Sequence, residues 1–188
     1  MKVTFDAPEE LVAELRRRAV AEDRSFAAEL RVAMRWRTLS PLARFVAESN
    51  RIEGINRLPT QTEIDAHAEL LALPAIDVPD LERFVQVVAR APLRERPGQN
   101  VRVGPHTPPA GGPHIRVKLD ELLHRIRLAE LTPMRGHVEY ETLHPFMDGN
   151  GRSGRALWAW QTQRDGRDPL AIGFLHAFYY QALNGLRR

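Results

Sequence analysis

The residue types that could carry out chemistry are concentrated in one run of the chain, His144-Pro145-Phe146-Met147-Asp148-Gly149-Asn150-Gly151-Arg152-Ser153-Gly154-Arg155. Gly149 and Gly151 allow the backbone to approach a ligand closely. If this run opens a helix, its N–H groups and the positive end of the helix dipole form an anion site. Arg152 and Arg155 are three positions apart, so on a helix both could bind phosphate oxygens.

A carboxylate and an imidazole complete this set of groups. Asp148 is a hard oxygen ligand of the kind that Mg²⁺ uses when it binds phosphates. His144 can take a proton near neutral pH. Together these groups suit attack on a nucleotide phosphate. An Asp-Gly-Asn-Gly run also forms turns without any function, whereas an EF-hand is excluded because the other Asp/Asn positions and the late Glu are missing.

The whole run resembles the signature of the Fic family, His-Pro-Phe-x-(Asp/Glu)-Gly-Asn-Gly-Arg-x-x-Arg, with every specified position filled. The resemblance implies an all-α fold in which the loop joins two central helices. It implies that His144 deprotonates a target hydroxyl, that Asp148 holds Mg²⁺ and that Phe146 anchors the loop. It assigns binding of the phosphates to Gly149, Asn150, Gly151 and Arg152. It assigns binding of the γ-phosphate to Arg155.

The reaction implied by the resemblance is transfer of AMP from ATP to a Ser, Thr or Tyr hydroxyl of a target protein, with pyrophosphate leaving. The related Doc toxins phosphorylate their targets and carry a Lys where this chain has Gly151, so nucleotidyl transfer is favoured here. Transfer of UMP or phosphocholine, as in a few family members, stays open. We therefore expect a protein adenylyltransferase that uses ATP and Mg²⁺.

Upstream, Ser49-Asn50-Arg51-Ile52-Glu53-Gly54 resembles the inhibitory motif of the family, Ser/Thr-x-x-x-Glu-(Gly/Asn). In this interpretation Glu53 pairs with Arg155 and removes the ligand of the γ-phosphate, while Ser49 and Gly54 fill the other motif positions. In some relatives the same Glu positions a water that removes AMP. A de-AMPylating hydrolase that uses Glu53 is therefore an alternative function.

Residues 95–114 are rich in Pro and Gly around Val101-Arg102-Val103, which predicts a small β-hairpin or flap. Within this stretch, residues 99–114 resemble the flap that precedes the active site in the family. An extended target segment pairs with the edge of such a flap by β-augmentation. The docking residues expected from this resemblance are Val101, Arg102, Val103, Gly104 and His106.

The elements that must position these residues are predominantly helical. Residues 60–63, Thr-Gln-Thr-Glu, form a capping box that starts a helix, and Pro74 ends it. The next helix has a buried stripe made of Leu81, Phe84, Val85 and Val88. Further helices are expected over residues 115–129, 133–143, from about 149 onward, and 169–186.

Residues 1–39 are expected to form a separate module before a Fic domain of residues 40–188. Lys2 to Asp6 alternate polar and apolar residues and predict a short strand, and helices follow after Pro8 and from Ser25. This layout resembles the ribbon-helix-helix module of bacterial regulators and antitoxins, which implies a homodimer. A DNA-binding regulator is thus a second alternative. Eight Lys/Arg against seven Asp/Glu in residues 1–40 do not separate DNA binding from dimerisation alone.

The 188 residues give room for one core and a small appendage. With 27 basic and 24 acidic residues, charge does not by itself indicate a nucleic-acid partner. The absence of cysteine excludes disulfides, thiolate catalysis and Cys-based zinc sites. Neither an apolar run of membrane-spanning length nor a signal-peptide layout is found, so we expect a cytoplasmic protein with no membrane partner.

Overall fold

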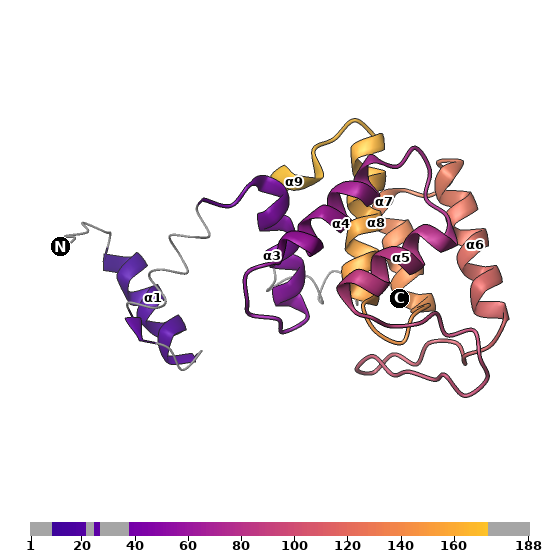
Figure 1. Ribbon diagram of the computed structural model, residues 1–188, viewed down its shortest axis with the longest axis horizontal. Coiled ribbons are helices and arrows are strands. Elements are labelled where there is room, and N and C mark those ends of the chain that lie inside the picture. The colour runs from indigo at the N-terminus through magenta and orange to yellow at the C-terminus, as the bar shows by residue number, and fades with distance from the viewer. Residues whose placement is uncertain (1–8, 22–24, 27–37, 173–188) are drawn as a thin grey trace. The chain divides into compact units, whose positions relative to one another are not determined.

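The computed structural model describes residues 9–21, 25–26 and 38–172. The chain divides into two compact units, residues 1–40 and residues 41–188. In the first unit the structure describes helix α1 (Glu9–Ala21), drawn in indigo in Figure 1. The strand expected over residues 2–6 and most of the helix expected from Ser25 lie outside the described residues.

The second unit is built from helices, which in chain order are α3 (Pro41–Ile52), α4 (Gln61–Ala72), α5 (Val78–Val88), α6 (His114–Arg127), α7 (Pro133–Leu143), α8 (Asn150–Arg164) and α9 (Pro169–Ile172). The predicted helical architecture is confirmed. Of the helix expected over residues 169–186, the structure describes α9. Within the described ranges, no helix has both the length and the apolar character needed to cross a membrane.

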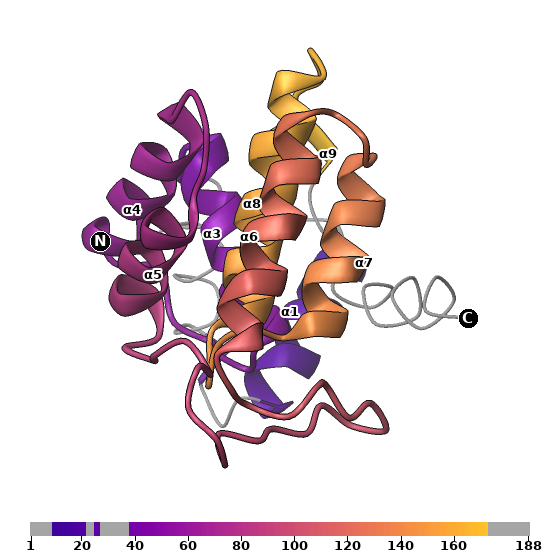
Figure 2. The ribbon, with the colours of Figure 1, turned by 90° about the vertical axis from the view of Figure 1, so that its right-hand side faces the viewer.

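Helix α8 runs through the middle of the second unit. It packs against α3, α4, α5, α7 and α9, and Figure 2 shows it between the α4–α5 pair and α7. Its side chains from Arg152 to Thr162 are all buried, as expected for a helix with neighbours on every side. The first turn of α8, which carries the signature residues, is therefore held in a rigid frame.

The apolar core lies where α4 to α8 meet. Its most deeply buried members include Leu81, Val85, Ile115, Leu119, Phe146 and Leu157. Complete burial of a side chain of this size stabilises the fold by about 1.5–3 kcal/mol. Because Phe146 belongs to the signature loop, the loop is packed as part of the core.

Side-chain caps fix where α4, α5 and α7 begin. The Thr60 hydroxyl accepts from the Glu63 N–H at 3.2 Å, and the Glu63 carboxylate accepts from the Thr60 N–H at 2.7 Å. Asp77 starts α5 with a second capping box, and the Thr132 side chain caps α7 ahead of Pro133. Each cap contributes about 1 kcal/mol and sets which residues of the helix face the core.

The prediction of a β-hairpin in the flap is wrong, because the described part of the chain contains no β-strand. Val103 and His106 exchange two backbone hydrogen bonds of 3.0 Å around Gly104, and this is an isolated bridge. Prolines at positions 105, 108 and 109 lack the N–H groups that a ladder needs. The segment between α5 and α6 is therefore an irregular loop (Figure 2).

Candidate active site

The signature loop connects α7 to α8 through two residues with a left-handed backbone. His144 ends α7 with φ 50° and ψ 62°, and Gly149 precedes α8 with φ 79°. A Cβ on Gly149 would lie 2.6 Å from the Cβ of Ala89, so conformation and space both require glycine there. The left-handed backbone costs His144 about 1–2 kcal/mol, and surrounding contacts must maintain it.

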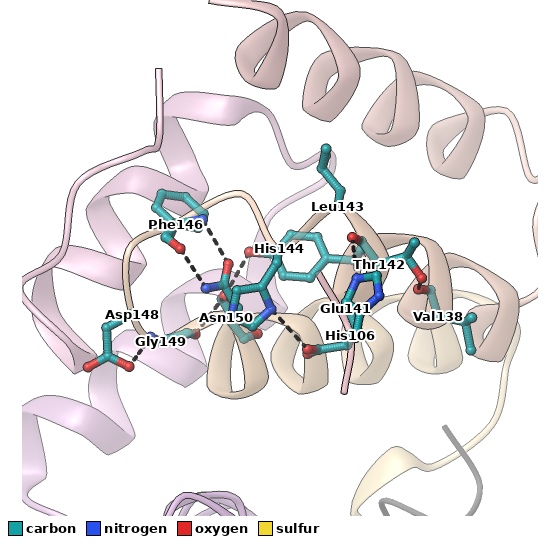
Figure 3. A network of polar contacts seen from close by, with 12 residues as sticks. His106, Val138, Glu141, Thr142, Leu143, His144, Phe146, Asp148, Gly149 and Asn150 are labelled. Carbon is teal, nitrogen blue, oxygen red and sulfur yellow. Dashed lines mark hydrogen bonds and ion pairs between the residues drawn. The ribbon is translucent and has the colours of Figure 1, made fainter. Parts of the chain in front are cut away.

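Phe146 and Asn150 close the loop on itself. The Phe146 N–H donates to Oδ1 of Asn150, and Nδ2 of Asn150 donates to the Phe146 carbonyl, both at 2.8 Å. Figure 3 shows the two residues facing each other within the loop. The Asn150 side chain therefore shapes the loop, and any contribution of this residue to phosphate binding must come from its backbone N–H.

A buried arginine that was not singled out from the sequence holds the same loop. Arg94 is fully buried and donates to the carbonyls of Leu143 and His144 at 2.9 and 2.7 Å. Its Nη1 donates to the carbonyls of Gln99 and Pro109, at 3.1 and 2.9 Å, in the flap segment. Burial lowers the pKa of the Arg94 guanidinium, and the negative end of the α7 dipole offsets part of that cost. One cation thus links the end of α7 to the flap.

The imidazole of His144 turns its Nδ1 inward. Nδ1 is buried and lies 3.8 Å from Oε2 of Glu141, a buried carboxylate on the last turn of α7. The His144 side chain is 14% exposed. Because Nδ1 is directed toward Glu141, we expect a substrate to approach Nε2. Nearby, Nε2 of His106 in the flap lies 3.0 Å from the Thr142 carbonyl (Figure 3).

Asp148 presents a carboxylate to solvent, with 69% of its side chain exposed. Its Oδ1 accepts from the Gly149 N–H at 2.6 Å, and its Oδ2 lies 3.6 Å from Nη2 of Arg152. No cluster of three or more His, Asp or Glu that could hold a metal is found in the described ranges. A single exposed carboxylate fits Mg²⁺ that arrives with nucleotide phosphates, since such ions use only one or two protein carboxylates.

The start of α8 has the features that favour binding of an anion. No side chain caps the helix, so the N–H groups of its first turn have no intrahelical acceptor and the positive end of the dipole is open to a ligand. Gly151 lies in this turn, and a Cβ there would overlap Oε1 of Glu53. The Glu53 carboxylate thus occupies the place where the helix end favours an anion.

Arg155 lies behind this site and is bound to α3. It is fully buried. Its Nε donates to the Ser49 hydroxyl at 2.9 Å, and its Nη2 donates to the Ser49 carbonyl at 2.9 Å and to Oε1 of Glu53 at 2.6 Å. Glu53 and Arg155, predicted as a pair, are therefore in contact although 102 positions separate them in sequence.

The end of α3 places Glu53 over α8. The Ile55 N–H donates to the Asn50 carbonyl and the Gly54 N–H donates to the Arg51 carbonyl, both at 3.0 Å. Gly54 has a φ of 75°, and this combination is the Schellman motif that ends many helices. Glu53 is consequently the last residue before the chain turns away, and its side chain continues toward Arg155.

Arg152 and the flap residues are positioned differently from the rest of the predicted set. The Arg152 side chain is 6% exposed and its Nη1 donates to the Val88 carbonyl at the end of α5, so it also braces the frame of the site. In the flap, Arg102 donates to the Gly104 carbonyl at 3.1 Å. Val101 and Val103 are half-buried, and their part in docking a target stays a prediction.

Arg94 and Glu141 are the residues at the site that were missed from the sequence. Arg94 stands in Leu93-Arg94-Glu95-Arg96, which is typical of a solvated surface. Glu141 lies three positions before His144, and that spacing on a helix is a signal that could have indicated it.

Comparison with known proteins bears on the segment that carries this site. The comparison with curated proteins gave no match. The model of the Fic/DOC family matches residues 80–162, which include most of α5, all of α6 and α7, the signature loop and most of α8. Ser49 and Glu53 lie outside the matched segment. Residues 80–162 of this chain, with His144 and the rest of the signature loop, belong to the Fic/DOC family.

Proposed function

We propose that the protein transfers AMP from ATP to a hydroxyl group of a target protein, and that Glu53 inhibits this transfer. The observation that carries the proposal is the position of the Glu53 carboxylate, at the start of α8 and on Arg155. A carboxylate in this place is bound by the groups that bind a phosphate, which are a helix N-terminus and an arginine.

In the proposed reaction the target hydroxyl loses its proton to Nε2 of His144 as its oxygen attacks the α-phosphorus of ATP. The bond between the α-phosphorus and the oxygen bridging to the β-phosphate breaks, and pyrophosphate leaves. The N–H groups at the start of α8 bind the phosphates and orient them for attack. Mg²⁺, bound to Asp148 and the phosphates, would neutralise phosphate charge.

Inhibition follows from competition for Arg155. While Arg155 donates to Glu53, it is not available to the γ-phosphate, and the carboxylate repels the phosphate oxygens. A charge-assisted hydrogen bond of this kind contributes about 1.5–3 kcal/mol. At roughly 1.4 kcal/mol per decade, its loss corresponds to about a tenfold to hundredfold change in rate.

Glu53→Gly should therefore transfer label from α-labelled ATP about tenfold to a hundredfold faster than the wild type. Glu53→Asp should fall between the two, because a shorter carboxylate reaches Arg155 less well. The measurement is incorporation of label into the protein itself and into proteins of a cell lysate.

Three controls define the outcome. Glu48→Gln removes a carboxylate of the same helix that pairs with Arg51, and it should label like the wild type. Adding Arg155→Ala to Glu53→Gly should cancel most of the gain, and adding His144→Ala should abolish the labelling. Equal labelling by the wild type and Glu53→Gly would show that Glu53 is not inhibitory, and label that survives His144→Ala would exclude His144 as the base.

Removal of AMP is the competing activity, and the geometry of Glu53 gives it a specific basis. The Glu53 side chain is 29% exposed, so one carboxylate oxygen could orient a water while the other stays on Arg155. A modified target incubated with the protein in the absence of ATP distinguishes the two activities. Loss of label in the wild type but not in Glu53→Gln would favour the hydrolase.

A further inference from the structure

Glu141 is a buried carboxylate in the wall of the active site. Its side chain is 5% exposed, and a buried charge is costly unless neighbouring groups stabilise it. It lies on the last turn of α7, three positions before His144. A carboxylate is rarely kept in such a place for packing alone, because an apolar side chain would fill the space at a lower cost.

The geometry directs this carboxylate at the proposed base. Oε2 of Glu141 is 3.8 Å from Nδ1 of His144, and Figure 3 shows the two side chains facing each other. The His144 backbone is fixed on both sides, because its N–H donates to the Tyr140 carbonyl at 2.8 Å and its carbonyl accepts from Arg94 at 2.7 Å. With the backbone fixed, the ring orientation depends on what Nδ1 meets.

Helix α8 leaves room for the carboxylate at one position. A Cβ on Gly154 would lie 2.6 Å from Oε1 of Glu141 and 2.9 Å from a ring carbon of Tyr140. Gly154 stands at a position that the signature leaves unspecified, between Arg152 and Arg155. The absence of a side chain at residue 154 is thus matched to the presence of Glu141 on the facing helix.

We infer that Glu141 is a positioning residue that holds the His144 imidazole with Nδ1 inward and protonated, so that Nε2 faces the target hydroxyl. This inference rests on the proposed transfer of AMP. When Nε2 takes the hydroxyl proton, the ring becomes an imidazolium, and the carboxylate beside Nδ1 stabilises that charge. The 3.8 Å separation is longer than a hydrogen bond, as catalytic contacts often are before a substrate is bound.

Several other charged or titratable groups lie near His144. Burial raises the pKa of the Tyr140 hydroxyl, which stays neutral and pairs with the Ser153 hydroxyl at 2.7 Å. The others are His137 two turns before His144 on α7, Arg94 at the His144 carbonyl, His106 at the Thr142 carbonyl, and Asp148 with Arg152 across the loop. Glu141 is the carboxylate that lies 3.8 Å from Nδ1 of the His144 ring.

The first test introduces Glu141→Gln into two parent proteins, the wild type and Glu53→Gly. The rate of AMP transfer and its pH dependence are then compared between each variant and its parent. Glu141→Gln should lower kcat by roughly 100-fold, as expected for a misplaced catalytic group, and leave KM for ATP unchanged. A carboxylate raises the pKa of a neighbouring His, so its removal should move the acidic limb of the pH profile to lower pH. Glu141→Asp keeps the charge and should recover part of both effects.

A matched control separates this role from a general effect on the helix. Glu139→Gln makes the same change on α7 at a carboxylate bound to Arg125 and Arg135, and it should leave kcat and the pH profile unchanged. If Glu141→Gln gives the same kcat and pH profile as its parent, the inference is overturned. If Glu141→Gln does not fold, Glu141→Asp decides, because a displaced carboxylate should lower kcat and leave KM for ATP unchanged.

The second test does not depend on catalysis. In ¹⁵N NMR spectra, the His144 ring is identified by the signals lost in His144→Ala. We expect Nδ1 to carry the proton in the wild type and the two tautomers to mix in Glu141→Gln. An unchanged tautomer overturns the inference. If no variant transfers AMP while the tautomer responds to Glu141→Gln, the proposed function is wrong and the contact between Glu141 and His144 stands.

Discussion

Asn150, Arg94 and Glu141 are buried polar residues, and each is directed at a different part of the signature loop. Asn150 bonds to both backbone groups of Phe146, Arg94 bonds to the carbonyls that end α7, and Glu141 faces the His144 ring. Buried polar groups of this kind are worth most when every partner is present. The loop therefore keeps a shape that its own turn-forming residues would not fix.

At this scale, Asn150→Ala should destabilise the protein and stop transfer. It removes two hydrogen bonds and leaves the buried Phe146 N–H without a partner, which costs about 2–4 kcal/mol. For a chain of this size that corresponds to a fall in Tm of roughly 4–16 °C, measured by thermal denaturation. Asn56→Ala, at an exposed asparagine, should change Tm by less than about 2 °C. A stable Asn150→Ala protein would show that Phe146 alone anchors the loop.

At the scale of elements, two helix ends meet at the site. The C-terminal end of α3 carries Glu53, and the uncapped N-terminal end of α8 carries Gly151. Gly54 makes this meeting possible, because its positive φ of 75° ends α3 where Glu53 reaches Arg155. Under the proposed inhibition, a change in how α3 ends should alter the rate of AMP transfer as well as the stability of the fold.

Gly54→Ala tests this coupling. A Cβ at this position meets no atom within 4 Å, so the effect comes from backbone strain, about 1–2 kcal/mol for a left-handed residue. We expect Tm to fall by roughly 2–8 °C and labelling from ATP to rise, because the last turn of α3 relaxes. Asn tolerates the left-handed conformation, so Gly54→Asn should restore most of both properties. Equal behaviour of the Ala and Asn variants would contradict the assigned role of the Schellman motif.

Apart from the Glu53–Arg155 pair, which was predicted from the family resemblance, what could be predicted from the sequence was set by distance along the chain. The capping box at Thr60 and the apolar stripe of α5 are local patterns, and the helices they predict are present. The signature loop is also contiguous, so its residues could be placed together. The hairpin at Val101 was predicted from the Pro and Gly residues around it, and these say nothing about whether a second strand is available to pair. Arg94 could not be identified, because its bonds to Leu143 and His144 cross about 50 positions.

At the scale of the whole molecule, the boundary between the two units in the sequence lies at the start of α3. The first unit ends at Ser40 and α3 begins at Pro41. The core residues from Ala66 to Trp160 all lie in the second unit, so this unit has what it needs to fold without residues 1–40. What residues 1–40 contribute is then open to direct measurement.

A chain that begins at Ser40 should be monomeric, whereas the full chain should be a dimer. The reason is the predicted strand over residues 2–6, since a single short strand leaves a row of backbone N–H and C=O groups that a second copy can pair. Light scattering after gel filtration measures the two masses, and the melting curve of the shorter chain controls for folding.

If the full chain binds DNA, added salt should weaken binding steeply, because bound phosphates release counterions. Retention of the dimer without residues 1–39 would exclude the ribbon-helix-helix interpretation. If the full chain is a dimer that does not bind DNA at low salt, the role of these residues is dimerisation.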